Sequence, residues 1–137
     1  MPRYNKLGFT PDQIICEDTA LPNATSADLT NVVTLDNKKS GNARIVICAA
    51  STQVELASGA TLTFRPSVGT TASCGTVLPA TIMTEAVQTD VTWAIGDVIC
   101  EITIPKYLIG SNKYLKITAV TSADESADKI EAYLVYD

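Results

Sequence analysis

Histidine is absent from this sequence. Its absence removes the commonest general base, the Ser-His-Asp and Cys-His catalytic sets, and every metal site that needs an imidazole ligand. Paired carboxylates could still act as acid and base, but most acidic residues fall in predicted turns or at strand ends, where Asp satisfies the local backbone. Glu101 and Glu131 lie within predicted strands, on polar sides that we expect to be solvated. We therefore predict that the chain is not an enzyme and has no catalytic residue, cofactor or metal.

Charge is also scarce. Charged residues make up 18% of the chain, against about a quarter of a typical soluble domain. Such a surface is either partly covered by a partner or rich in Thr, Ser and Asn. The net charge of −5 argues against binding to nucleic acid or to anionic membranes, which both favour a basic face. We expect neither as a partner.

Long hydrophobic runs and an export signal are missing as well. No apolar run approaches the ~20 residues that a membrane-spanning helix needs. The first nine residues contain two basic side chains but not the apolar stretch of a secretory signal. We therefore expect the protein to be made and used without export.

The cysteines do not form any familiar motif. Cys16, Cys48, Cys74 and Cys100 are far apart, and none belongs to a C-x-x-C pair. This spacing favours neither a zinc site nor a thioredoxin-type redox site. Cys48 and Cys100 lie in apolar strand patterns, where a thiol behaves as a small buried hydrophobe. We expect all four to be reduced thiols.

What the sequence does contain is a series of short alternating segments. Alternation of apolar and polar residues, rich in Val, Ile, Thr and Tyr, is typical of half-buried strands. About eight such segments with short turns between them predict an all-β fold, an antiparallel β-sandwich that is jelly-roll-like. The predicted strands cover residues 31–36, 43–50, 60–65, 76–87, 91–95, 98–105, 113–121 and 129–136.

The 137 residues are the usual size of one domain. Residues 1–30 show no clear periodicity and contain Pro2, Pro11 and Pro22, so we predict an extended N-terminal arm or lead-in there. Residues 31–137 then form a single β-sandwich domain. An acidic segment, residues 122–128, joins the last two predicted strands, and we expect a hairpin with an exposed acidic tip.

Two features are candidates for contact with a partner. The first is the N-terminal stretch with Arg3, Tyr4, Lys6, Leu7 and Phe9, which combines positive charge and aromatic rings with no acid. It is either a frayed terminus or an arm that becomes ordered on a neighbouring subunit. The second is the last predicted strand, which has bulky side chains on both faces. Either one face meets a partner, or both faces are covered within the sandwich.

The order of the last strands resembles that of a known protein family. Residues 93–105 (WAIGDVICEITIP), 113–121 (KYLKITAVT) and 128–137 (DKIEAYLVYD) resemble the end of the Bbp16-type capsid cement (decoration) proteins of tailed bacteriophages. The shared order is an aliphatic strand to a proline, a K/R-Y-L strand, a short turn, and a strand to the C-terminal Asp. The resemblance covers the C-terminal third, and none of its motifs is catalytic.

This resemblance implies a jelly-roll-like structural protein on the outer surface of an icosahedral phage head, assembled in the cytoplasm of a bacterial host. It implies the major capsid protein as a partner, and self-association as a dimer or, alternatively, a trimer. Two other functions remain open: a carbohydrate-binding β-sandwich module, and another virion component from the tail or neck. Sugar sites usually present several exposed aromatics, whereas aromatics are 6% here and the single tryptophan, Trp93, is expected in the core.

Overall fold

The computed structural model describes residues 13–36, 38, 39, 41–78 and 89–136. Within these residues it contains eleven strands and one short helix. The strands are β1 (Ile14–Ala20), β2 (Ser26–Asp28), β3 (Val33–Thr34), β4 (Ala43–Ala49), β5 (Val54–Leu56), β6 (Leu62–Gly69), β7 (Thr76–Val77), β8 (Val91–Trp93), β9 (Val98–Ile104), β10 (Tyr114–Thr121) and β11 (Lys129–Tyr136), and the helix is α1 (Lys106–Ser111). In the described part of the chain, no helix is long and apolar enough to cross a membrane.

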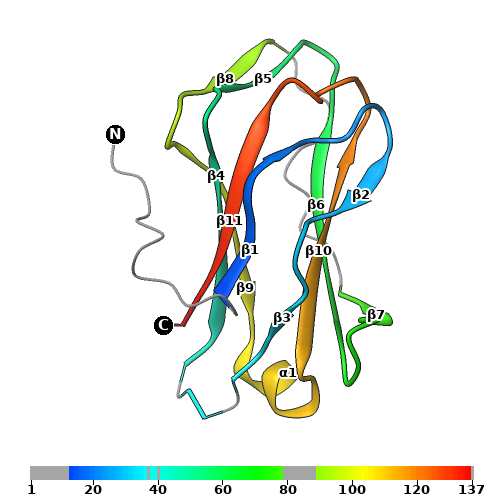
Figure 1. Cartoon of the computed structure of the whole chain (residues 1–137), viewed down its shortest axis with the longest axis vertical. Helices are drawn as coiled ribbons and strands as arrows, with labels where there is room; N and C mark the ends of the chain where they lie inside the picture. The colour runs from blue at the N-terminus through cyan, green and yellow to red at the C-terminus, as the bar shows by residue number, and fades with distance from the viewer. Residues whose placement is uncertain (1–12, 37, 40, 79–88, 137) are drawn as a thin grey trace.

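The strand order identifies the fold as a jelly roll. A four-stranded sheet has the order β1-β11-β4-β9, and a five-stranded sheet has the order β2-β10-β6-β7, with β3 also paired to β10. The two sheets face each other as layers of a sandwich (Figure 1). The antiparallel pairs β1 with β11, β2 with β10, β4 with β9 and β6 with β7 are nested in the sequence. This nesting, a long hairpin rolled into two sheets, confirms the predicted all-β sandwich and its jelly-roll-like topology.

The core lies between the two sheets and is built from alternate strand residues. On β10, Leu115, Ile117 and Ala119 are fully buried members of the core, while Tyr114 and Lys116 lie half-buried on the opposite face. This division is the one that the alternation of the sequence predicts, because successive side chains of a strand point to opposite faces. β10 pairs along its whole length with β6.

β6 continues through a proline, beyond the predicted end of the strand at residue 65. The carbonyl oxygen of Pro66 accepts a hydrogen bond from the backbone N–H of Leu78 at 3.0 Å. The nitrogen and the carbonyl oxygen of a strand residue point to the same side, so the proline nitrogen faces Leu78 and not β10. The missing N–H therefore does not interrupt the pairing with β10. The strand therefore extends to Gly69.

The sandwich begins earlier in the chain than the predicted boundary at residue 31. β1 pairs with β11 and β2 with β10, so both strands belong to the sheets although they lie within the predicted lead-in. The alternation of apolar and polar residues in β1 is irregular. Its register with β11 shifts between Ile14 and Cys16 and again before Thr19, and Asp18 has a φ of 42°. The residues of β2 are all exposed, so they show no alternation.

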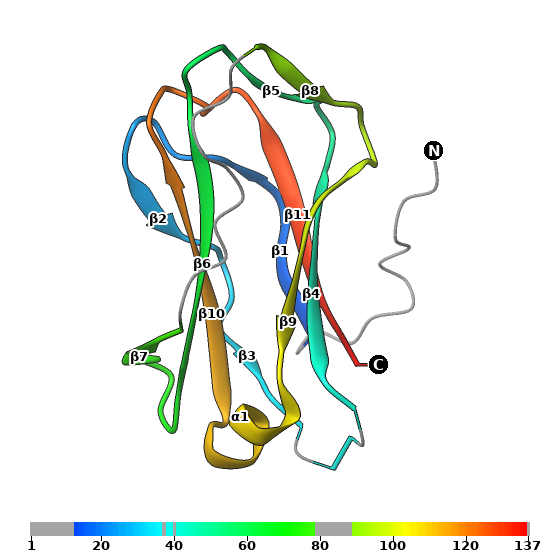
Figure 2. The same cartoon turned by 180° about the vertical axis from the view of Figure 1, so that it is seen from behind.

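The predicted hairpin of the last two strands is wrong. β10 belongs to the five-stranded sheet and β11 to the four-stranded sheet, so residues 122–128 cross from one layer to the other (Figure 2). Glu125 in this crossing segment is buried, at 7% exposure, and does not sit on an exposed tip. Neighbouring strands in a sequence often pair, but in a jelly roll the last strand returns to pair with the first.

Candidate interaction surfaces

The contact residues predicted from the sequence, Arg3, Tyr4, Lys6, Leu7 and Phe9, lie outside the described residues. Three surfaces of the described sandwich stand out by charge, exposure or burial. Two of them are its opposite ends, and the third is the outer face of the four-stranded sheet.

The two ends of the sandwich differ in charge. β5 and β8 lie at one end and α1 lies at the other (Figure 1), and we call these the β5–β8 end and the α1 end. The acidic residues at the β5–β8 end are Glu55, Asp90, Asp124, Glu125 and Asp128. The basic residues at the α1 end are Lys38, Lys39, Lys106 and Lys113, next to the acidic Asp36.

Several contacts hold the α1 end together. The backbone N–H of Lys106 donates to Asn42 Oδ1 at 2.9 Å, and the Lys106 ammonium donates to the carbonyl oxygen of Lys39. The Lys39 ammonium in turn lies 5.9 Å from the centre of the Tyr136 ring, within the range of a cation–π contact. The Tyr136 hydroxyl accepts a hydrogen bond from the backbone N–H of Asp36 at 2.8 Å. These contacts fix α1 and the loop before β4 against the end of β11.

An exposed tyrosine projects from this end. Tyr107 in α1 is 76% exposed, the highest value among the large hydrophobic side chains of the described residues. It follows Lys106, and Lys113 after the helix lines a hollow of about 290 Å³. A tyrosine ring buries a large area on binding while its hydroxyl can still hydrogen-bond, which is why tyrosine is enriched at interfaces. The α1 end therefore offers an aromatic anchor among lysines, a surface that fits an acidic partner.

Acidic side chains of the β5–β8 end accept hydrogen bonds from nearby backbone N–H groups. The Asp128 carboxylate accepts a hydrogen bond from the backbone N–H of Glu55 at 3.0 Å, and Asp90 accepts one from Ser58 at 2.8 Å. Burial, helped by the charge and hydrogen bond of Asp128, raises the pKa of the Glu125 carboxyl to about 7. Among the described residues, no group of three or more His, Cys, Asp or Glu side chains is arranged to hold a metal ion.

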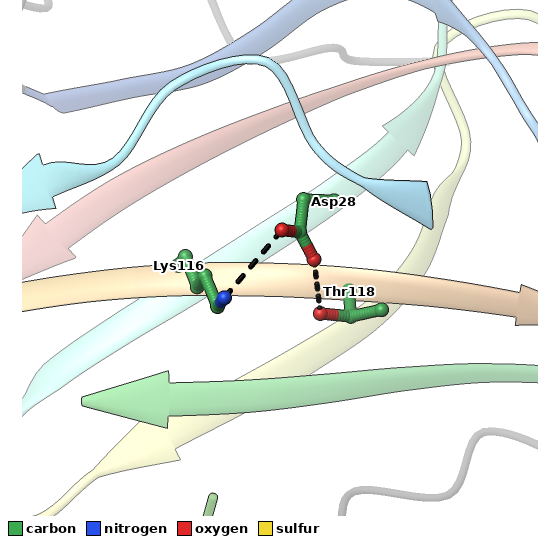
Figure 3. Close-up of polar contacts among 3 residues, drawn as sticks. All are labelled: Asp28, Lys116 and Thr118. Atoms are coloured by element: carbon green, nitrogen blue, oxygen red, sulfur yellow. Dashed lines mark hydrogen bonds and ion pairs between the residues drawn. The ribbon is translucent and has the colours of Figure 1, made fainter. Parts of the chain in front are cut away.

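A small polar cluster lies on the outer face of the five-stranded sheet. Asp28 on β2 accepts a hydrogen bond from the Thr118 hydroxyl at 2.7 Å, and its other oxygen lies 3.5 Å from the Lys116 ammonium (Figure 3). The register places Thr118 directly opposite Asp28. Because these side chains are partly exposed, we expect the ion pair to contribute only ~0.2–1 kcal/mol. Its main effect is to fix the short strand β2 against β10.

The outer face of the four-stranded sheet, the side turned away from the five-stranded sheet, is buried. Val46 and Cys48 on β4 and Tyr133 on β11 are 0% exposed, and Glu131 is 4% exposed. The register sets Val46 beside Tyr133 and Cys48 beside Glu131. The Tyr133 hydroxyl donates a hydrogen bond to Glu131 Oε2 at 2.9 Å. The expectation of a solvated Glu131 is therefore wrong, and β11 is covered on both faces.

The cysteines and the tryptophan behave as predicted. All four cysteines are buried thiols. Burial raises the pKa of Cys16 to about 12 and that of Cys100 to about 11, so neither forms the reactive thiolate at neutral pH. Trp93 is partly buried and packs against the core.

The comparisons with known proteins do not identify a family for this chain. No family model matches the chain, and no curated protein matches it. Among solved structures, this chain is similar to a protein chain in the structure of infectious bursal disease virus, Gx strain, with a TM-score of 0.46 and 14% sequence identity. The match covers 88% of this chain and 30% of that chain, so this chain spans less than a third of the viral one. The resemblance to Bbp16-type proteins stays a prediction from the sequence.

Proposed function

We propose that this chain is a structural virion protein, a cement or decoration protein that binds the outer surface of a phage head and stabilises the mature shell. The observation that carries the proposal is the nested jelly-roll connectivity, because this architecture recurs in viral capsid domains. The sequence resemblance of the last strands supplies the specific role. One fold hosts many functions, so the proposal has to be tested by binding to phage heads.

The protein would stabilise the mature shell by binding to that state and not to the precursor. A copy that binds the expanded lattice and not the precursor shifts the equilibrium toward the expanded state. The symmetry of the shell repeats a modest interface many times, so avidity raises the total effect. This role needs a contact surface and no catalytic group, which agrees with a sequence that lacks histidine.

The α1 end is our candidate for the contact with the major capsid protein. Tyr107 would act as the anchor, since exposed aromatic side chains that become buried often dominate binding energy. Lys106 and Lys113 would steer the end toward an acidic surface and set its orientation. The hydrogen bonds of Lys106 to Asn42 and Lys39 already order this end, so less entropy is lost on binding.

The decisive experiment adds the purified protein to phage heads that lack it. We expect it to co-sediment with mature, expanded heads but not with precursor shells, and to raise the temperature at which the heads release their genome. Equal release temperatures with and without the protein would contradict the proposal. Binding to a glycan array instead of heads would favour the carbohydrate-binding module. Labelled protein on the tail or neck in negative-stain images would favour another virion component.

Matched variants test the α1 end as the contact. Tyr107→Ala, and separately Lys106→Glu with Lys113→Glu, should each weaken binding to heads by about tenfold or more. The loss in the charge variant should shrink at high salt because salt screens exposed charges. Arg65→Glu, at an exposed position on β6, is the control and should change little. Equal losses from Arg65→Glu and the α1 variants would place the contact elsewhere. The oligomeric state, a dimer or a trimer, is checked by the mass in solution.

A further inference from the structure

β9 is a free edge of the four-stranded sheet. It pairs with β4 on one side, and no described strand pairs with its other side. On that side, the backbone of β9 has no hydrogen bond to another described backbone group. Unpaired N–H and C=O groups along an edge strand are a template for pairing with a further strand. β9 therefore offers a row of backbone donors and acceptors to a partner.

The other sheet edges are short or irregular. β1, at the opposite edge of the same sheet, has two register shifts and Asp18 at positive φ. In the five-stranded sheet, β2 and β3 share one edge and contain three and two residues, and β7 at the other edge contains two. Short and bulged edges hinder pairing with another chain. β9 has seven residues, and its pairing with β4 is regular from Cys100 to Ile104.

The regular part of β9 lacks the residues that usually protect an edge. It contains neither proline nor lysine. Cys100, Ile102 and Ile104 belong to the core on the inner face, whereas Glu101 and Thr103 are exposed on the outer face. A strand added at this edge would therefore meet an apolar row on one face and two polar side chains on the other.

The single charge in this part of β9 is compensated within the sheet. Glu101 Oε2 lies 3.2 Å from Arg44 Nη1 on β4. Because this guanidinium offsets the carboxylate, the edge does not present an isolated negative charge. A chain with a net charge of −5 can then approach the edge without strong local repulsion.

The sequence of this stretch is complementary to itself. Residues directly opposite each other in a sheet share a face, so a twofold axis between two β9 strands has to pass through a residue. Ile102 is the centre of the stretch from Cys100 to Ile104. An axis there sets Cys100 opposite Ile104 of the second copy, and Glu101 opposite Thr103 of the second copy. Apolar side chains then meet on the inner face, and a carboxylate meets a hydroxyl donor on the outer face.

Other positions of the axis fit less well. An axis at Glu101 would set two glutamates directly opposite each other, and like charges in that position are destabilising. An axis at Cys100 would carry the pairing past the register shift at the start of β9. An axis at Thr103 would carry it into Pro105, which has no N–H to donate. The stretch therefore favours the register centred on Ile102.

We propose that the free edge of β9 is the docking site of β9 from a second copy of this chain, in an antiparallel pair about a twofold axis at Ile102. The two four-stranded sheets then join into one sheet with the order β1-β11-β4-β9-β9-β4-β11-β1. Backbone hydrogen bonds supply the affinity, as in other cases of strand addition. The contact between Glu101 and Thr103 occurs twice by symmetry and sets the register. A twofold interface closes on itself, so the assembly is a dimer.

Opposite charges at one position test this pairing. Thr103→Glu sets a carboxylate opposite Glu101 of the second copy and should weaken dimerisation by about tenfold, because the repulsion occurs twice. Thr103→Lys sets an opposite charge there and should strengthen dimerisation by about threefold. Adding Glu101→Lys to Thr103→Glu restores opposite charges across the interface and should restore the dimer. Sedimentation equilibrium at micromolar to millimolar protein measures the dissociation constants.

A matched control makes the result specific to this edge. Thr76→Glu is the same change at an exposed position on β7, at an edge of the other sheet, and should not alter dimerisation. Circular dichroism checks the fold of each variant, and if Thr103→Glu does not fold, the effect of Thr103→Lys decides. A parent protein that stays monomeric or forms a trimer would overturn the proposal. A dimer that responds alike to both charges at position 103 would overturn it too.

This proposal does not depend on the cement role, because no phage head takes part in the measurement. It selects the dimer from the two oligomers that the sequence resemblance implies, and it assigns the interface. A β9 dimer that fails to bind heads would contradict the cement role alone. A monomer that binds heads would contradict the β9 pairing alone.

Discussion

β10 and β11 have similar alternating sequences and equivalent central places in their sheets, yet their outer sides differ. β10 presents Tyr114, Lys116 and Thr118 to its outer side, and all three remain half-buried. β11 presents Glu131 and Tyr133, and both are buried. The inward residues of the two strands behave alike. The comparison teaches that alternation tells which side chains share a face, but not whether that face is covered.

The difference extends to the strand beside β11. β4 (ARIVICA) is apolar on both faces apart from Arg44, which is what a strand covered on both sides needs. β6, the partner of β10, has the exposed Arg65 on its outer side. The central strands of the four-stranded sheet are therefore buried on both faces, whereas β10 and β6 keep partly exposed residues on their outer side. Substitutions at equivalent positions of the two sheets should therefore change the free energy of unfolding by different amounts.

The largest difference is expected between two tyrosines on the outer faces. Tyr133→Ala removes a fully buried ring from β11 and should lower the free energy of unfolding by about 3–5 kcal/mol. Tyr114→Ala removes a half-buried ring from β10 and should cost about 1 kcal/mol. Urea unfolding of the two variants and the parent protein measures both effects. Equal losses would show that the outer faces are not different.

The hydroxyl of Tyr133 should account for part of that loss. Tyr133→Phe keeps the ring but removes the hydrogen bond to the buried Glu131 carboxylate, and should cost about 1–3 kcal/mol because that oxygen is shielded from water. Tyr114→Phe is the matched control and should be close to neutral. Adding Glu131→Gln to Tyr133→Phe should recover part of the loss. If the denaturation midpoint of the double variant does not recover, other groups stabilise the Glu131 carboxylate.

The connection between β10 and β11 adds a pH dependence. Burial raises the pKa of Glu125 in the folded protein from its ordinary value of 4.5 to about 7, so folding favours the protonated carboxyl between these values. The contribution of this group is full below pH 4.5 and is lost as the pH rises through about 7. We expect the loss to be about 1 kcal/mol, since the segment lies near solvent.

The measurement for Glu125 compares stability curves from pH 4 to pH 8 for the parent protein and Glu125→Gln. The parent should lose stability relative to the variant as the pH rises, and the difference isolates this carboxyl from the others. Glu55→Gln, at an exposed position of the same end, is the control. Parallel curves for the parent and Glu125→Gln would contradict the assignment.

The sequence predicted the fold well where strands alternate regularly. β4, β9, β10 and β11 lie close to their predicted ranges because mostly aliphatic residues recur on their inward faces, although β4 and β11 are buried on both faces. The turn before β9 was also predicted, and Gly96 there has a φ of 86°, which glycine adopts easily. The class of fold follows from such local rules.

The parts that were missed depend on contacts between distant residues. β1 contains register shifts and Asp18 at positive φ, and it is a strand because it pairs with β11 at the other end of the chain. The sequence predicts a solvated Glu131 because a glutamate in an alternating strand usually is, but the residue is buried and accepts a hydrogen bond from Tyr133. The predicted contact residues precede the described part of the chain, so they stay a prediction. The exposed Tyr107 was missed because a helix of six residues is too short for periodicity.

The smallest effect is expected at the polar cluster of the five-stranded sheet. A double-mutant cycle with Asp28→Ala and Lys116→Ala should give a coupling energy of ~0.2–1 kcal/mol, because both side chains are partly exposed to water. The coupling should fall as salt is raised, since screening is effective at such sites. Thr118→Val keeps the shape of the side chain and reports the separate hydrogen bond to Asp28. A salt-independent coupling above ~2 kcal/mol would mean that this pair is shielded from water. The outer face of the five-stranded sheet would then be covered too, and the contrast between the two sheets would fail.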